Sequence, residues 1–405
     1  MTTTVRAPLP TVYLVWLSGS LLSRLGDTAF FFALGWAATG YGGRTAGLVL
    51  TAVALPRTLL LLLGGVVGDR ICVRRVLLVG DGTMVLVVGL VAALSATVGP
   101  SLWLLITAGL VVGAVDAFTM PSAASMARRL VPLADVDRAS GLNQTRSQLI
   151  SLIAGPVGAF LVATGGLGLA AAVDAGTFGF ALVAVLMRKG LAPHPPSGPH
   201  VSLLRSATQG VALSIRHPVL RPGLLLTGAV AGLAIPVGSL LVPLLARAHH
   251  WGPQGAGLLL GAQAVGALAV SAAVARSGAL PRAGVVAAGS AAPMAVGVCL
   301  LALASQLTLG VAGAVLLGAG IGLFVTHLGP LLLCASPGTH LARVQAVITL
   351  VQNVSLLATV NLVGVAADEI GAPGAALGSA ALLALAGTVA LMTPGIRAGE
   401  VSRPG

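Results

Sequence analysis

The chain consists of long apolar runs separated by short polar joints. Twelve runs reach the roughly 20 residues that a helix needs to cross a bilayer. They span 11–39, 45–68, 76–98, 101–127, 139–164, 167–188, 219–246, 254–275, 283–304, 308–334, 342–366 and 372–393. The runs are continuous, which excludes the short alternating strands of a membrane barrel. The very short joints Gly99-Pro100 and Gly165-Gly166 leave ten or eleven spans as alternatives. The pattern predicts an all-α membrane protein whose first run is retained as a span, not cleaved as a signal peptide.

The longest polar segment lies near the centre and divides the runs into two groups of six. It begins with RKGLAPHPPSGPH, from Arg188 to His200, whose prolines and glycines exclude a span. In the following VSLLRSATQGVALSIRHP, apolar residues recur every three or four positions, which indicates a short helix on the cytoplasmic membrane face or an ordinary connector. The sequence thus predicts a six-helix half over 1–188, a linker over 189–218 and a second six-helix half over 219–405. Two such pseudo-symmetric halves are typical of transporters built from repeats.

Composition and charge support lipid as the solvent of the chain. Charged residues make up 8% of the sequence, against about 25% in soluble domains. Most of the 22 Lys and Arg residues lie in alternate joints, and the other joints hold only Arg44 and Arg247. By the positive-inside rule, we expect a multi-pass protein of the plasma or inner membrane with both termini cytoplasmic. This topology and contact with anionic lipid explain the net charge of +12 without a nucleic-acid partner.

Six charged side chains lie inside predicted spans and away from the cytoplasmic span ends, where each is costly and is therefore a functional candidate. They are Arg24, Asp27, Arg57, Asp116, Arg146 and Asp174. Helix rise places Asp27 at the depth of Arg57, and Asp116 at the depth of Arg146, so both pairs could meet. A paired aspartate is a structural strut, whereas one whose partner moves away can bind a proton. Both roles stay open for Asp27 and Asp116. The arginines are more typical of counter-ions than of substrate ligands. Asp174 lies near the outer end of its span, a position that favours a structural role.

The second half offers three uncharged candidates. His327 is either a satisfied structural group, the commoner role of a lone histidine, or a proton carrier. Gln352 and Asn353 either bind a substrate or bridge helices.

The joint between the second and third runs carries a compact charged motif, GGVVGDRICVRRVLL, from Gly64 to Leu78. Its glycines allow close helix approach, and its aspartate can cap a helix or pair with arginine. The motif resembles the loop signature of the major facilitator superfamily, with matches at Gly65, Asp69, Arg70 and Arg74. That resemblance implies a major facilitator fold in which Asp69, Arg70 and Arg74 latch the cytoplasmic ends of the two halves.

Other stretches resemble one branch of that superfamily, the proton-coupled exporters of drugs, macrolides and enterobactin-type siderophores. These stretches include SRLGDTAFFFALGW, the LPR at Leu55–Arg57, and GPVGAF. In GPVGAF, Gly155 and Pro156 match the Gly-Pro signature that exporters carry in their fifth span. The resemblance implies an antiporter that confers drug resistance.

Patterns of other functional classes are not apparent in the sequence. It has no GxxxxGK[ST] for ATP, its three cysteines are far apart, and it shows no metal or catalytic pattern. We therefore expect neither an enzyme nor a cofactor. The expected function is proton-coupled efflux of a small amphipathic compound by a monomer, with that compound, protons and membrane lipid as partners. An importer or lipid-moving relative, and a non-transporting receptor or scaffold, are the alternatives. A scaffold would gain nothing from buried charges that cost about 3 kcal/mol each.

Overall fold

A computed structural model describes residues 10–70, 73–132, 135–186, 217–336 and 341–397. The regular elements of these residues are all helical. The first group comprises α1 (Thr11–Thr39), α2 (Gly43–Arg70), α3 (Val73–Thr97), α4 (Leu102–Leu130) and α5 (Val136–Leu186). The second comprises α7 (Leu220–Pro236), the π-helical turn η2 (Val237–Leu241), α8 (Val242–Ala248), α9 (Gly252–Ser277), α10 (Ala283–Gly289), α11 (Ala291–Leu303), α12 (Leu307–Cys334), α13 (Leu341–Glu369), α14 (Gly371–Met392) and the short α15 (Pro394–Arg397). The predicted linker helix lies outside the described residues.

The helices supply the twelve predicted crossings. Nine segments of the described residues are long and apolar enough to span a membrane, and one of them, Gly141–Val183, contains two crossings. These crossings are the two legs of α5, which meet where Gly165 and Gly166 leave helical geometry. Gly166 has a φ of 62°, which glycine adopts without a Cβ penalty. The helices α1 and α2 complete the set, so this all-α membrane protein has the predicted twelve-helix plan.

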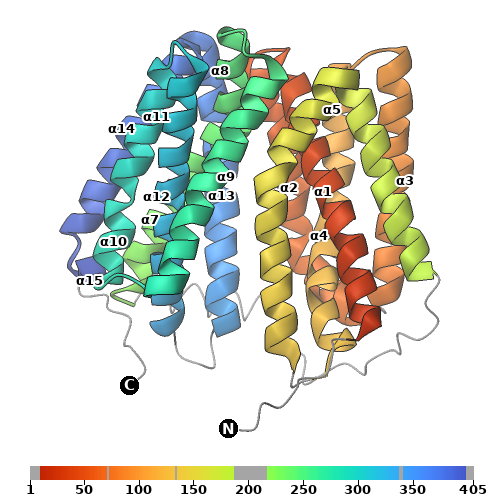
Figure 1. Cartoon of the computed structure of the whole chain (residues 1–405), viewed down its shortest axis with the longest axis horizontal. Coiled ribbons are helices and arrows are strands. Elements are labelled where there is room, and N and C mark those ends of the chain that lie inside the picture. Colours follow the sequence, from red (N-terminus) through yellow and green to blue (C-terminus); the bar gives the residue numbers. More distant parts are fainter. Residues whose placement is uncertain (1–9, 71–72, 133–134, 187–216, 337–340, 398–405) are drawn as a thin grey trace.

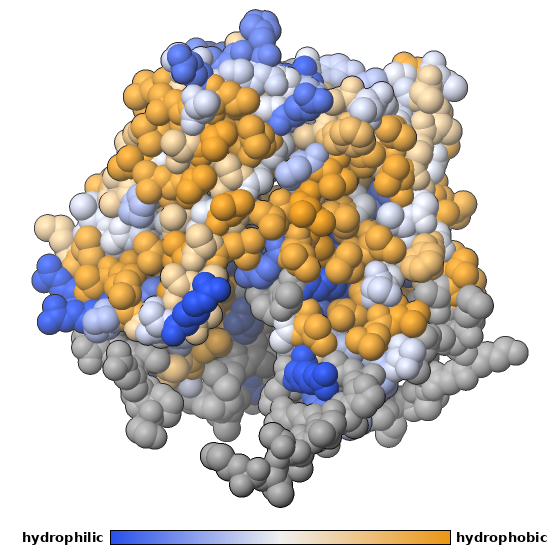
Figure 2. Space-filling model, viewed as in Figure 1, coloured by the Kyte–Doolittle hydropathy of each residue, from blue (hydrophilic) through white to orange (hydrophobic). Residues whose placement is uncertain are grey.

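The two groups of helices stand side by side (Figure 1). Within the first group, α1 packs on α5 and α2 packs on α4; within the second, α9 packs on α12 and α11 packs on α14. The groups meet mainly through two helix pairs, α5 with α9 and α2 with α13, with smaller contacts of α1 on α8 and of α1 and α2 on η2. Apolar residues cover much of the sides of the molecule in Figure 2, as a chain in lipid requires.

The two ends of the bundle differ in charge. We call the end where α1 begins, and where Arg74, Arg276 and Arg282 lie, the basic end. We call the other end, which carries the joints 40–42, 249–251 and 370, the opposite end. At the basic end, α2 stays helical through Arg70, so Asp69 and Arg70 belong to a helix end and not, as predicted, to a loop.

Candidate functional site

A cavity of about 830 Å³ lies between the two groups of helices. Its lining comes from α1, α2 and α5 on one side and from α7, η2, α8, α9, α12 and α13 on the other. The surface is hollowed between the groups in the lower part of Figure 2. Most lining residues are apolar, and the polar exceptions are Thr28, Arg57, Gln148, Ser151, Thr227, Ser239, Gln263, Ser271, Gln352 and Asn353. Three residues that the sequence offered as cavity candidates, Arg57, Gln352 and Asn353, are among the lining residues.

Two polar contacts, which we call the clasps, join the groups at the opposite end. In the first, Asp368 Oδ1 accepts from the backbone N–H of Gly43 at 2.6 Å and Oδ2 from that of Arg44 at 2.8 Å, which caps the start of α2. In the second, Arg247 Nε donates to Thr39 Oγ1 at 2.7 Å, and Nη2 donates to the Trp36 carbonyl at 2.8 Å. The Arg247 guanidinium also lies 4.4 Å from the centre of the Trp36 ring. These contacts close the opposite end.

The contact between α5 and α9 shows where the groups separate. Gly155 and Gly257 approach so closely that a Cβ on Gly257 would overlap Ala159, and the Pro156 ring lies against Gly261. Towards the basic end of the same helices, Gln148 and Ser271 line the cavity. The two groups therefore touch in the half of the bundle near the opposite end, and they diverge towards the basic end.

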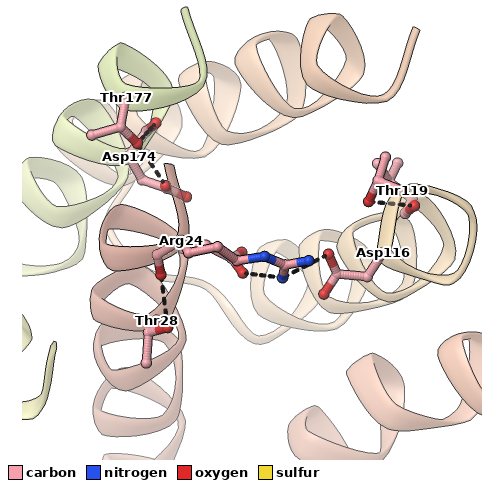
Figure 3. Close-up of polar contacts among 8 residues, drawn as sticks. Arg24, Thr28, Asp116, Thr119, Asp174 and Thr177 are labelled. Atoms are coloured by element: carbon pink, nitrogen blue, oxygen red, sulfur yellow. Dashed lines mark hydrogen bonds and ion pairs between the residues drawn. The ribbon is translucent and has the colours of Figure 1, made fainter. Parts of the chain in front are cut away.

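A cluster of charged groups is built around Arg24 of α1 (Figure 3), one helical turn from Thr28, which lines the cavity. Arg24 Nη1 is 3.5 Å from Asp27 Oδ2 on the same helix and 3.9 Å from Asp116 Oδ1 on α4. Both aspartates are buried, with 3% and 4% of their surface exposed. Asp27 Oδ1 has no hydrogen-bond partner among the residues that the structure describes. Two carboxylates thus share one guanidinium, and neither lines the cavity itself.

Asp174 joins this region, which corrects its predicted place near the outer end of a span. Its side chain is fully buried against Gly26, in the middle of α1, where a Cβ would lie 2.7 Å from Asp174 Oδ1. Thr177 Oγ1 donates to Asp174 Oδ1 at 3.3 Å, as drawn in Figure 3, and Asp174 Oδ2 has no hydrogen-bond partner in the described part of the chain. The absence of a Cβ on Gly26 lets this third acid approach the helix that carries Arg24 and Asp27.

The two ion pairs expected from helix depth are not formed in the described residues. Arg24, not Arg57 or Arg146, neutralises Asp27 and Asp116. Arg57 faces the cavity, although its charge still acts on both aspartates. Arg146 donates a short hydrogen bond to Ser20 Oγ and lies 5.9 Å from the Trp16 ring centre. Depth along a helix fixes the height of a side chain but not the face on which it lies.

His327, which the sequence offered either as a structural group or as a proton carrier, is not among the residues that line the cavity. It is fully buried, and its Nε2 accepts from the Leu280 N–H at 3.0 Å. Its Nδ1 lies 2.9 Å from the Leu323 carbonyl, so the neutral Nδ1–H tautomer satisfies both ring nitrogens. The His327 ring therefore links the 278–282 joint to α12. This contact is what a structural role of His327, one of its two predicted roles, would require.

The structure also adds lining residues that the sequence analysis missed, notably Gln148, Thr227 and Gln263. Gln263 and Thr227 stand in otherwise apolar runs, and that isolation was the available signal.

The predicted latch is described only at Arg74. Its Nη2 donates to the Leu186 carbonyl at 3.3 Å, a contact inside the first group and not between the groups. The side chains of Gly65, Asp69 and Arg70 lie outside what the structure describes.

Two helical groups around a central cavity that is closed at one end are the architecture of an alternating-access membrane transporter. The chain belongs to the Major Facilitator Superfamily, whose family model matches residues 16–360. Membership of this family makes the protein a membrane transporter. A comparison with curated proteins found no match.

Solved structures share the fold at low sequence identity. A mutant of the nucleoside transporter NupG has a TM-score of 0.77 and 12% identity, over 95% of this chain and 100% of that one. A POT family transporter bound to a thioalcohol-conjugated peptide has a TM-score of 0.76 and 14% identity, over 96% and 97% of the two chains. The human organic anion transporter MFSD10 (TETRAN) has a TM-score of 0.60 and 16% identity, over 95% and 100%. These likenesses establish the fold alone.

Proposed function

We propose that the protein exports a small amphipathic compound, of the drug, antibiotic or siderophore-like kind, in exchange for protons. The observation that carries this proposal is the largely apolar cavity between the two groups, together with the buried acids of the first group that share one arginine. The protein works as a monomer in the cell membrane, with the basic end and both termini in the cytoplasm. In the state described here, the cavity faces the cytoplasm and can collect its compound there.

The cluster around Arg24 supports proton coupling. Asp27 and Asp116 together carry one more negative charge than Arg24 neutralises, and they are buried on α1 and α4. A proton on either acid removes the excess charge, which is costly away from water. The two acids sit on different helices, so a movement of α1 against α4 changes how they share Arg24. The cluster can thereby link proton binding to the conformational change.

The positions of Gly155 and Pro156 support the export direction. These residues carry the resemblance to exporters, and they form the contact with Gly257 and Gly261 of α9. The motif therefore lies where the two groups must separate if the cavity is to open to the opposite end.

Proton-linked uptake is a second candidate, favoured by the position of Arg57. Arg57 lines the cavity and acts on the charges of Asp27 and Asp116. A ligand group that neutralises Arg57 would make proton binding by these acids more favourable in the same state. Exchange then requires that ligand and proton bind in different states, whereas uptake lets them travel together.

Transport in proteoliposomes with an imposed pH gradient tests the proposal. A thermal-shift screen of antibiotics and siderophores first selects ligands, and internal pH is then followed on substrate addition. We expect protons to move against the substrate, and this movement to be lost in Asp27→Asn or Asp116→Asn. The control Asp135→Asn, at the basic end and outside the cluster, should leave it unchanged. Protons moving with the substrate would establish uptake instead, and substrate flux without proton movement would overturn proton coupling.

A further inference from the structure

Arg57 is the one charged side chain among the described residues that line the cavity. It follows Pro56 on α2 and is partly exposed to the cavity. The structure gives its guanidinium no hydrogen bond or ion pair with any residue that it describes. The other span arginines differ, because Arg24 holds two aspartates and Arg146 holds Ser20.

A guanidinium without a partner is costly inside a membrane span. Asp27 and Asp116 are the acids near it, and both are already engaged by Arg24. A carboxylate, sulfonate or phosphate group of a ligand would complete the site, because the planar guanidinium forms paired hydrogen bonds with such oxyanions.

The remaining lining defines the rest of the ligand. Phe31, Phe32 and Phe324 are part of the largely apolar wall. The second group contributes the neutral amides Gln263, Gln352 and Asn353. A cationic ligand would meet a positive charge and, among the described lining residues, no carboxylate. A volume of about 830 Å³ falls within the range of pockets that hold drug-sized molecules.

We propose that the cavity binds an amphipathic anion, with the anionic group on Arg57 and the apolar body against the phenylalanines. This inference rests on the proposed function only in taking the cavity as the substrate site, and it specifies the charge class of the substrate. It holds for export and for uptake.

Binding of three probes with the same naphthalene body tests the inference without any transport step. The probes are 2-naphthalenesulfonate, 2-naphthalenesulfonamide and 2-naphthylmethylammonium, and calorimetry measures their affinity for the full chain in nanodiscs, with empty nanodiscs subtracted. We expect the sulfonate to bind at least tenfold more tightly than the sulfonamide, and the ammonium probe to bind most weakly. In Arg57→Gln the sulfonate should fall to the level of the sulfonamide.

Two further variants separate charge recognition from folding. Arg57→Lys keeps the charge but not the paired geometry, and should retain a reduced preference for the sulfonate. Arg146→Gln removes a span arginine that does not line the cavity, and should leave the preference intact. The inference is overturned if the sulfonate does not bind, if it binds no better than the sulfonamide, or if Arg57→Gln keeps the preference. A chain that binds the sulfonate but moves no substrate would refute the proposed function and leave this inference standing.

Discussion

Polar side chains inside the helical spans of this protein differ in their hydrogen-bond and ion-pair partners. His327 is satisfied by Leu280 and Leu323, and Arg24 by Asp27 and Asp116. Arg57 faces a cavity without a partner in the described part of the chain. This difference separates a structural histidine from an arginine that is open to a ligand.

Replacing His327 should affect stability and not transport. In His327→Leu, the Leu280 N–H loses its acceptor, and the net loss of such a hydrogen bond costs about 0.5–1.5 kcal/mol. His327→Gln keeps an acceptor on the side chain and should recover part of that loss. Thermal unfolding in detergent measures the difference between the two variants. Both should retain the pH profile of transport, and a changed profile in His327→Gln would return His327 to the proton carriers.

Sequence located the costly residues but not their partners. Charges inside apolar runs are visible in the sequence, so Arg24, Asp27, Arg57 and Asp116 could all be named in advance. Their pairing depends on which face of each helix turns towards which neighbour. The close approach of Asp174 to Gly26 depends on helix crossing, which hydropathy does not encode.

At the scale of helices, closure of the opposite end depends on a few contacts at helix ends. Removing Arg247 deletes two hydrogen bonds and the contact with the Trp36 ring. Hydrogen bonds from charged groups contribute about 1.5–3 kcal/mol each, so Arg247→Ala should shift the population at least tenfold towards separation at this end.

Spin labels across the opposite end measure that separation. Labels at Tyr41→Cys and Ile370→Cys, in a background where Cys72, Cys299 and Cys334 are serine, should show a longer distance in Arg247→Ala. Arg276→Ala, which removes an exposed arginine at the basic end, serves as control and should leave the distance distribution unchanged. An unchanged distribution in Arg247→Ala would show that this clasp does not hold the end closed.

The glycine contact between α5 and α9 should respond in the same assay. Leucine at Gly257 would overlap Ala159 and the backbone of Gly155, so Gly257→Leu should force the helices apart and lengthen the distance. Gly89→Leu on α3, where a Cβ would meet nothing within 4 Å, is the matched control. Equal effects of both leucines would indicate general destabilisation instead of a specific contact between the groups.

Helices were the most predictable level of this structure. The run 11–39 coincides with α1, and 372–393 differs from α14 by one residue at each end. Apolar length alone sets these bounds, because a span must match the bilayer. The π-helical turn after Pro236 and the clasps were not predicted, since they depend on local bonding and on partners distant in the sequence.

For the whole molecule, the charge moved in one cycle distinguishes the two transport directions. Exchange of a monovalent anion for a proton moves two charges across the membrane, each worth about 2.3 kcal/mol per 100 mV. Movement of the same anion together with a proton transfers no net charge. An anion on Arg57 therefore makes membrane potential a direct test of coupling.

We expect voltage to drive anion flux at equal pH on both sides. In proteoliposomes, valinomycin and a potassium gradient set the potential, and efflux of 2-naphthalenesulfonate should accelerate when the compartment that contains it is negative. Arg57→Gln should abolish this flux, because the anion loses its site. Asp27→Asn or Asp116→Asn should weaken the voltage dependence if that acid carries the exchanged proton, because one of the two charges no longer moves. Flux that carries protons with the anion and ignores voltage would instead assign the protein to proton-linked uptake.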